Sequence, residues 1–183
     1  SQILRQSREE LIKRIYKNKT NWKVGNVASY SKRNILKIKS NKPKIVIMPS
    51  CFFDAHHFFR YSLFPDVYQW MDFTLNHASK TDFEWFVKPH PNNLPINFNV
   101  YKFFEKKYPT IRFLDSNTSN LTFKKNKFAS MFTFQSSAVH EFAFMNIPSV
   151  VVTDNVSVNY KFGQPIKSIN DYKKLIYKAD QIK

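Results

Sequence analysis

Short β-branched runs alternate with amphipathic helical segments from residue 44 to the end of the chain. The pattern predicts five strands, at 44–48, 83–88, 111–114, 128–134 and 149–152. It predicts intervening helices at 66–79, 98–107, 116–124 and 136–145, and a closing helix at 170–182. A strand that must return in the same direction needs a crossover, so strands separated by single helices predict a parallel sheet. We therefore expect an α/β fold, a Rossmann-like doubly wound parallel sheet of about five to six strands.

The length of 183 residues suits one globular domain. We expect a basic amphipathic helix at 8–19 and a linker or peripheral segment at 21–42, so residues 1–42 precede a Rossmann-like domain at 43–183. A helical pattern that already runs by Glu9, after a first residue that is not Met, predicts further sequence on the N-terminal side. The single cysteine, Cys51, excludes an internal disulfide and a zinc finger. No apolar run reaches the roughly 20 residues of a membrane span, and we expect a cytoplasmic protein.

The net charge is +16, from 29 basic and 13 acidic side chains. Such a charge points to nucleic acid, an anionic membrane surface or an anionic substrate. An AT-rich genome would also encode a composition of this kind, with abundant Lys, Asn, Ile, Phe and Tyr and two glycines. The positive net charge alone therefore does not identify a ligand.

In doubly wound sheets, ligands bind beyond the carboxyl ends of the strands. The loop after the second predicted strand runs Lys88-Pro89-His90-Pro91-Asn92, where two prolines fix the backbone around the histidine. An imidazole there can donate to a phosphate oxygen, and a neighbouring lysine adds charge. The alternative is that His90 bonds a backbone carbonyl and is structural.

The loop after the fourth predicted strand runs Gln135-Ser136-Ser137 into a helix. Two hydroxyls at a helix start can hold a phosphate together with the first-turn amides, or one of them can simply cap the helix. Gly25 and Gly163 are the two glycines, which excludes both a dinucleotide GxGxxG loop and a Walker A loop.

Glu141 lies one helical turn beyond Ser137 and can accept the hydroxyls of a ribose. Asp54, His56 and His57 follow the first predicted strand. Two histidines and an aspartate are a partial metal set, but contact with a sugar or acceptor is the reading we prefer.

Together these loops resemble the C-terminal half of a GT-B glycosyltransferase of the bacterial capsule and surface-polysaccharide type. The resemblance covers about residues 44–153. It rests on Phe53-Asp54-Ala55-x-His57, Phe64-x-Asp66-x-Tyr68-x-Trp70, Trp85-Phe86-Val87-Lys88-Pro89-His90-Pro91-Asn92 and Gln135-Ser136-Ser137-x-x-x-Glu141, followed by Ile147-Pro148-Ser149-Val150-Val151. HP and SS motifs in this order resemble those of sialyl-, polysialyl- and Kdo-transferases.

The resemblance implies that His90 acts in catalysis at the phosphate of a nucleotide-sugar donor, most simply a CMP-sugar. It implies a nucleotide site formed by Lys88, His90, Asn92, Gln135, Ser136, Ser137 and Glu141. No metal or other cofactor is required, because these groups can neutralise the phosphate. The general base would belong to a missing N-terminal domain of the same protein, with Asp54 as the nearest candidate here. Asn146 stands where such proteins usually carry a small residue or glycine.

Other readings remain open. Related layouts occur in teichoic-acid glycerophosphotransferases and in UDP-GlcNAc 2-epimerases. A nucleic-acid-binding module would explain the charge, but no recognition motif supports it, and we expect no nucleic acid. A third reading is a non-catalytic domain that docks a capsule assembly complex at the anionic inner membrane through the helix at 8–19. The expected partners are a nucleotide sugar and a glycan acceptor.

Overall fold

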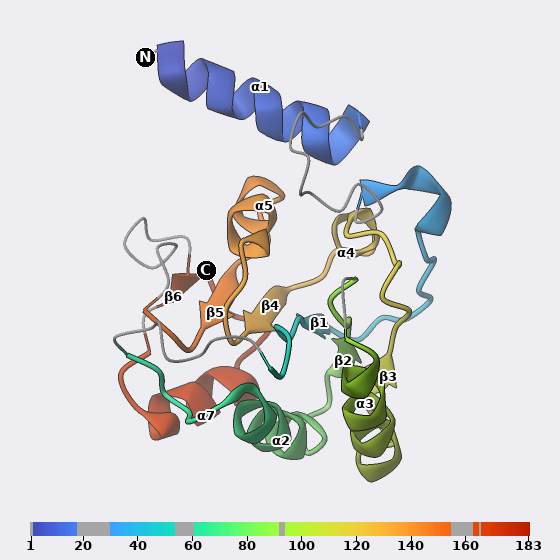
Figure 1. Cartoon of the computed structure of the whole chain (residues 1–183), viewed down its shortest axis with the longest axis vertical. Coiled ribbons are helices and arrows are strands. Elements are labelled where there is room, and N and C mark those ends of the chain that lie inside the picture. The colour runs from blue at the N-terminus through green and yellow to red at the C-terminus, as the bar shows by residue number, and fades with distance from the viewer. Residues whose placement is uncertain (1, 18–29, 54–60, 92–93, 155–162, 165) are drawn as a thin grey trace.

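A computed structural model describes residues 2–17, 30–53, 61–91, 94–154, 163–164 and 166–183. Within these residues the chain forms a six-stranded sheet in the order β3-β2-β1-β4-β5-β6, and every pair of neighbouring strands is parallel (Figure 1). The strands are β1 (Lys44–Ile47), β2 (Glu84–Val87), β3 (Arg112–Phe113), β4 (Ser130–Thr133), β5 (Ser149–Val151) and β6 (Gly163–Gln164). The predicted Rossmann-like doubly wound fold is confirmed.

Helices cover both faces of the sheet. The helices of the described residues are α1 (Gln2–Lys17), α2 (Val67–Ala78), α3 (Pro95–Lys107), α4 (Leu121–Lys125), α5 (Ala138–Phe144) and α7 (Ile169–Tyr177), with a 3-10 turn at Lys32–Asn34; α1 lies over α5 (Figure 1). The chain first runs from β1 outward to β3 with α2 and α3 on one face, then crosses back to β4 and β5 with α4 and α5 on the other (Figure 1). Right-handed crossovers require this change of face when the direction of winding reverses. None of the helices in the described ranges has the length and apolar character to cross a membrane.

Alternation along the strands divides the core into two clusters. Ile45 and Ile47 face the cluster under α2, α3 and α7, whereas Val46 faces the cluster under α4 and α5. Trp70 and Trp85 are the largest side chains of the first cluster, and both are fully buried. Because successive residues of a strand point to opposite faces, the unbroken apolar runs seen in the sequence are what a sheet covered on both sides requires.

The predicted helices and strands all form, with shifted ends. Asp66 caps α2 as expected, since its side chain accepts a hydrogen bond from the Gln69 N–H. The helix predicted at 116–124 begins only at Leu121, because Asp115 holds the preceding residues in a turn through the Asn117 N–H (2.7 Å) and the Thr118 N–H (2.9 Å). Strand β6 carries no recognisable strand pattern and was not predicted.

The segment expected to be peripheral runs along α4 where it is described. Tyr30 is 2% exposed and belongs to the core cluster under α4 and α5. The backbone N–H of Leu36 donates to the Thr122 hydroxyl (3.2 Å), and that of Ile38 donates to the Asn126 side chain (2.9 Å). Residues 21–29 lie outside the described residues.

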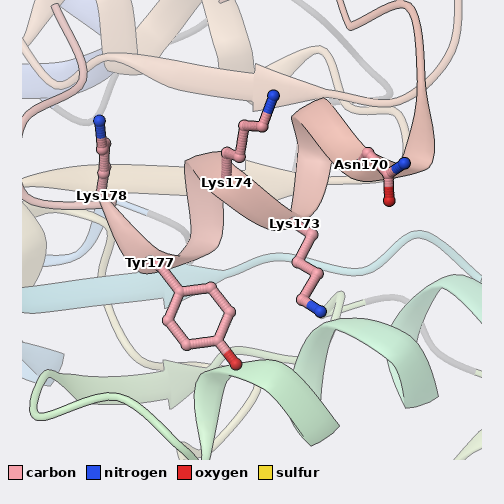
Figure 2. A pocket seen from close by; sticks show the side chains of 5 residues that line it. All are labelled: Asn170, Lys173, Lys174, Tyr177 and Lys178. Carbon is pink, nitrogen blue, oxygen red and sulfur yellow. The ribbon is translucent and has the colours of Figure 1, made fainter.

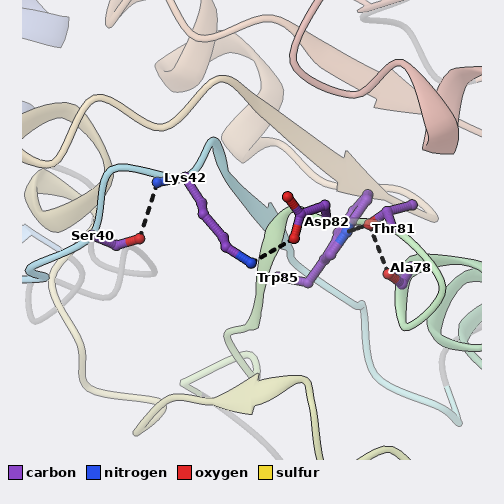
Figure 3. A network of polar contacts seen from close by, with 6 residues as sticks. All are labelled: Ser40, Lys42, Ala78, Thr81, Asp82 and Trp85. Atoms are coloured by element: carbon purple, nitrogen blue, oxygen red, sulfur yellow. Dashed lines mark hydrogen bonds and ion pairs between the residues drawn. The ribbon is translucent and has the colours of Figure 1, made fainter.

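A polar network joins the loops that precede β1 and β2. Lys42 pairs with Asp82 at 2.5 Å, and the Trp85 indole N–H donates to the Thr81 hydroxyl, which donates to the carbonyl of Ala78 (Figure 3). These contacts lie at the amino ends of the strands, so they stabilise the edge of the sheet opposite to the one where ligands bind in this fold.

Two helices end in a left-handed residue that is not glycine. Asn146 (φ 59°) follows α5, and Lys127 (φ 54°) follows α4. In each case the next N–H reaches back to the third-last helical carbonyl, Ile147 to Phe142 (2.9 Å) and Phe128 to Phe123 (3.0 Å), which is a Schellman motif. Asn146 therefore takes the conformation for which a glycine is favoured, and the tight turn from α5 into β5 is made.

We predict that Lys127→Gly stabilises the protein by about 0.5–1 kcal/mol, because a left-handed backbone strains a residue that has a Cβ atom. Urea unfolding measures the change. The matched control is Lys125→Gly, in the last turn of α4, which should destabilise by a similar amount. Equal effects of the two substitutions would contradict the assigned backbone conformation.

Candidate functional site

The sheet reverses its winding between β1 and β4. Both predicted loops lie at the carboxyl edge of the sheet, which is the edge formed by the carboxyl ends of the strands. Strand β1 pairs with β2 on one side and with β4 on the other. The loop that carries His90 follows β2, and the loop that carries Ser136 and Ser137 follows β4. Since neighbouring strands are about 4.8 Å apart, the two strand ends are separated by roughly 10 Å, within the span of a nucleotide. The structure therefore brings these two loops to one edge of the sheet.

Lys88 is a buried cation at the end of β2. Its side chain is on the face of Phe86, toward α5, and the residue is 1% exposed. Burial lowers the pKa of Lys88 to about 8, although the charges of Glu141 and Asp115 act in the opposite direction. Lys88 thus sets a positive potential behind the loop without contacting solvent. His90 is exposed and follows the buried Pro89.

The two serines have different surroundings. The Ser136 hydroxyl accepts a hydrogen bond from the Ala138 N–H (3.1 Å), whereas Ser137 is exposed and makes no side-chain cap. The N–H groups of Val139 and His140 donate to the carbonyls of Ser136 and Ser137, both at 3.3 Å. These three first-turn amides are used internally, so the exposed Ser137 hydroxyl is the group of this loop most accessible to a ligand. Gln135 is half-buried beside it.

Glu141 is 5% exposed and has direct partners on both carboxylate oxygens. Arg14 Nη2, from α1, lies 2.8 Å from Oε1, and the Tyr30 hydroxyl donates to Oε2. The Asn120 amide in turn donates to the Tyr30 oxygen (3.4 Å). Burial raises the pKa of Glu141, while Tyr30, Arg14 and Lys88 oppose that rise. In this conformation a ribose would have to replace one of these partners to reach the carboxylate.

The remaining predicted residues are not placed. Asp54, His56, His57 and Asn92 lie outside the described residues. In the ranges that are described, no cluster of three or more His, Cys, Asp or Glu side chains could hold a metal ion.

A separate hollow of about 430 Å³ lies on α7, lined by Asn170, Lys173, Lys174, Tyr177 and Lys178. Its lysines diverge: Lys174 and Lys178 point away from α2, and Lys173 points toward it (Figure 2). The Ser130 hydroxyl, at the start of β4, donates to the carbonyl of Ala179 just beyond this helix (2.6 Å). The C-terminal end of α7 therefore lies at the amino ends of the strands, and the residues that line the hollow include none of the candidate site.

Sequence reasoning missed the contribution of the N-terminal segment. Tyr30 is separated from Glu141 by 111 residues, and Arg14 is still more distant along the chain. A basic helix gives no sign of which of its cations will meet a buried carboxylate, and an isolated tyrosine after a polar stretch gives no sign of burial.

Comparison with models of protein families gives no match, and neither does comparison with curated proteins. A solved structure described as "S. aureus MnaA-UDP co-structure" aligns with a TM-score of 0.48 and 16% sequence identity. The alignment covers 86% of this chain and 44% of that chain, so this chain spans less than half of its length. The fold assignment rests on the strand order and pairing described above.

We predict that the free energy of unfolding rises between pH 8 and pH 9.5, by up to about 1.4 kcal/mol per pH unit. An unfolded lysine keeps its proton up to its ordinary pKa of 10.5, whereas Lys88 releases it near pH 8. The unfolded state therefore binds more protons in this window, and stability increases with pH. Denaturant titrations across the window should show the rise in the parent and in the exposed control Lys80→Met, but not in Lys88→Met. The same slope in all three proteins would contradict the burial of Lys88.

Proposed function

We propose that this chain is the donor-binding domain of a GT-B glycosyltransferase that moves a sugar from a CMP-linked donor to a bacterial capsule or surface glycan. The observation that carries the proposal is the convergence of the HP loop and the SS loop on one edge of a doubly wound sheet, at its point of reversal. Buried Lys88 and exposed Ser137 flank the end of β1 from its two sides, which suits an anionic ligand between them.

The chemical task of such a site is to stabilise the nucleotide phosphate as it departs from the sugar. A charge that is buried in a low-dielectric setting acts more strongly than one in water. Lys88 supplies that field, the Ser137 hydroxyl supplies a donor, and His90 supplies a second donor from the opposite loop. These groups replace a divalent cation in neutralising the phosphate, and no metal is needed.

The rest of the reaction belongs to groups outside this site. Activation of the acceptor hydroxyl requires a general base, which we assign to an N-terminal domain that faces the carboxyl edge of the sheet. Glu141 as a ribose contact, and the acceptor contacts at Asp54, His56 and His57, are part of the same proposal. On this account the isolated chain binds a nucleotide but does not turn over a nucleotide sugar.

Calorimetry with CMP, CDP, UDP and the corresponding nucleotide sugars tests the proposal. We expect binding of CMP and its sugars, weakened about tenfold or more in Ser137→Ala and in His90→Ala, because each variant loses a hydrogen bond to an anion. The matched control is His77→Ala, on α2 at the other face of the sheet, where the imidazole contacts Tyr177; it should bind like the parent.

Two results would contradict the proposal. One is the absence of binding by every ligand of the panel. The other is binding that the Ser137 and His90 variants leave unchanged. If UDP binds and CMP does not, the nucleotide site stands and the donor is a UDP-sugar instead of a CMP-sugar.

A further inference from the structure

We propose that Arg14, delivered by the N-terminal helix α1, is a phosphate-binding residue of the nucleotide site and that Glu141 and Tyr30 hold it in position. The inference rests on the proposed function and assigns one more ligand contact to that site. In this inference Glu141 keeps Tyr30 and Arg14 on its two oxygens, so a role in positioning Arg14 replaces the ribose contact proposed above for Glu141.

Burial of the Glu141 carboxylate costs solvation free energy. A carboxylate that is 5% exposed is stable only if hydrogen bonds and an opposite charge replace its water. Tyr30 and Arg14 provide these on separate oxygens, Arg14 at 2.8 Å. The guanidinium is thereby fixed against α5 by a partner that cannot easily turn to solvent.

The charges around Glu141 do not cancel. Arg14 and Lys88 carry two positive charges against the single negative charge of Glu141. Asp115 also interacts with Lys88, but it is exposed and therefore screened by solvent. Lys88 is 1% exposed, whereas the Arg14 side chain is 32% exposed. The accessible part of the excess positive charge is consequently the Arg14 guanidinium.

The spacing along α5 relates Glu141 to Ser137. Glu141 lies four residues beyond Ser137, about 6 Å along the helix, so the carboxylate that pairs with Arg14 belongs to the residue one helical turn beyond Ser137. A guanidinium has five N–H groups in a planar fork. With one nitrogen on Glu141, N–H groups remain for a phosphate oxygen that Ser137 also contacts.

Helix α1 contacts the domain through its C-terminal half. Residues 2–10 of the helix are exposed, and its contact with the domain is made by the last turns, where Ile15 is fully buried. The Tyr16 ring lies 6.2 Å from that of Phe144 on α5. These apolar contacts follow directly after Arg14, so α1 has packing contacts with the domain besides the ion pair.

The experiment measures CMP affinity by calorimetry and the melting temperature for the parent, Arg14→Gln, Arg14→Lys and Arg8→Gln, with UDP as the probe if CMP does not bind. Arg8 is an exposed arginine of the same helix and serves as the matched control. We expect Arg14→Gln to weaken binding about tenfold or more, Arg14→Lys to recover part of the affinity, and Arg8→Gln to bind like the parent.

Three outcomes would overturn the inference while leaving the proposed function intact, provided that the parent binds. Arg14→Gln could lower the melting temperature with no change in affinity, which makes the ion pair a tether only. It could bind more tightly than the parent, which makes α1 a cover over Glu141. Equal losses of affinity in Arg14→Gln and Arg8→Gln would show that the overall positive charge of the protein, and not a contact made by Arg14, affects nucleotide binding. If the parent binds none of the nucleotides and nucleotide sugars of the panel, the proposed function itself fails.

Discussion

The pairing of β1 with β2 on one side and with β4 on the other is the constraint on which the rest of the structure depends. Because the winding reverses there, α2 and α3 cover one face and α4 and α5 cover the other. In doubly wound sheets, ligands bind beyond the carboxyl ends of the strands at such a reversal. A phosphate bound at this edge would meet groups from both windings of the chain.

Two buried charged residues, Lys88 and Glu141, interact with each other. Lys88 and Glu141 are both removed from solvent, which lowers the pKa of the first and raises the pKa of the second. Each makes the ionised form of the other less costly, and Tyr30 and Arg14 complete the compensation at Glu141. The N-terminal segment therefore contributes two of the four polar groups of this cluster, Arg14 and Tyr30.

Local sequence patterns predicted most of the fold, because strand alternation, the Asp66 cap and the apolar face of each helix are properties of neighbouring residues. The two candidate loops were predicted from proline, serine and histidine at strand ends. The surroundings of Glu141 could not be predicted, since Arg14 and Tyr30 reach it only through tertiary packing. Likewise, Ser136 and not Ser137 caps α5, a choice between adjacent hydroxyls that backbone conformation decides.

The most direct measurement is the change in backbone amide chemical shifts when CMP, or UDP if that is the nucleotide bound, is added to the isotope-labelled chain. The account predicts shifts concentrated at Lys88, His90 and residues 136–138, with smaller ones near Arg14, and none along α7. Shifts confined to Lys173, Lys174 and Lys178 would place the anion on the outer helix and contradict a nucleotide site at the carboxyl edge of the sheet.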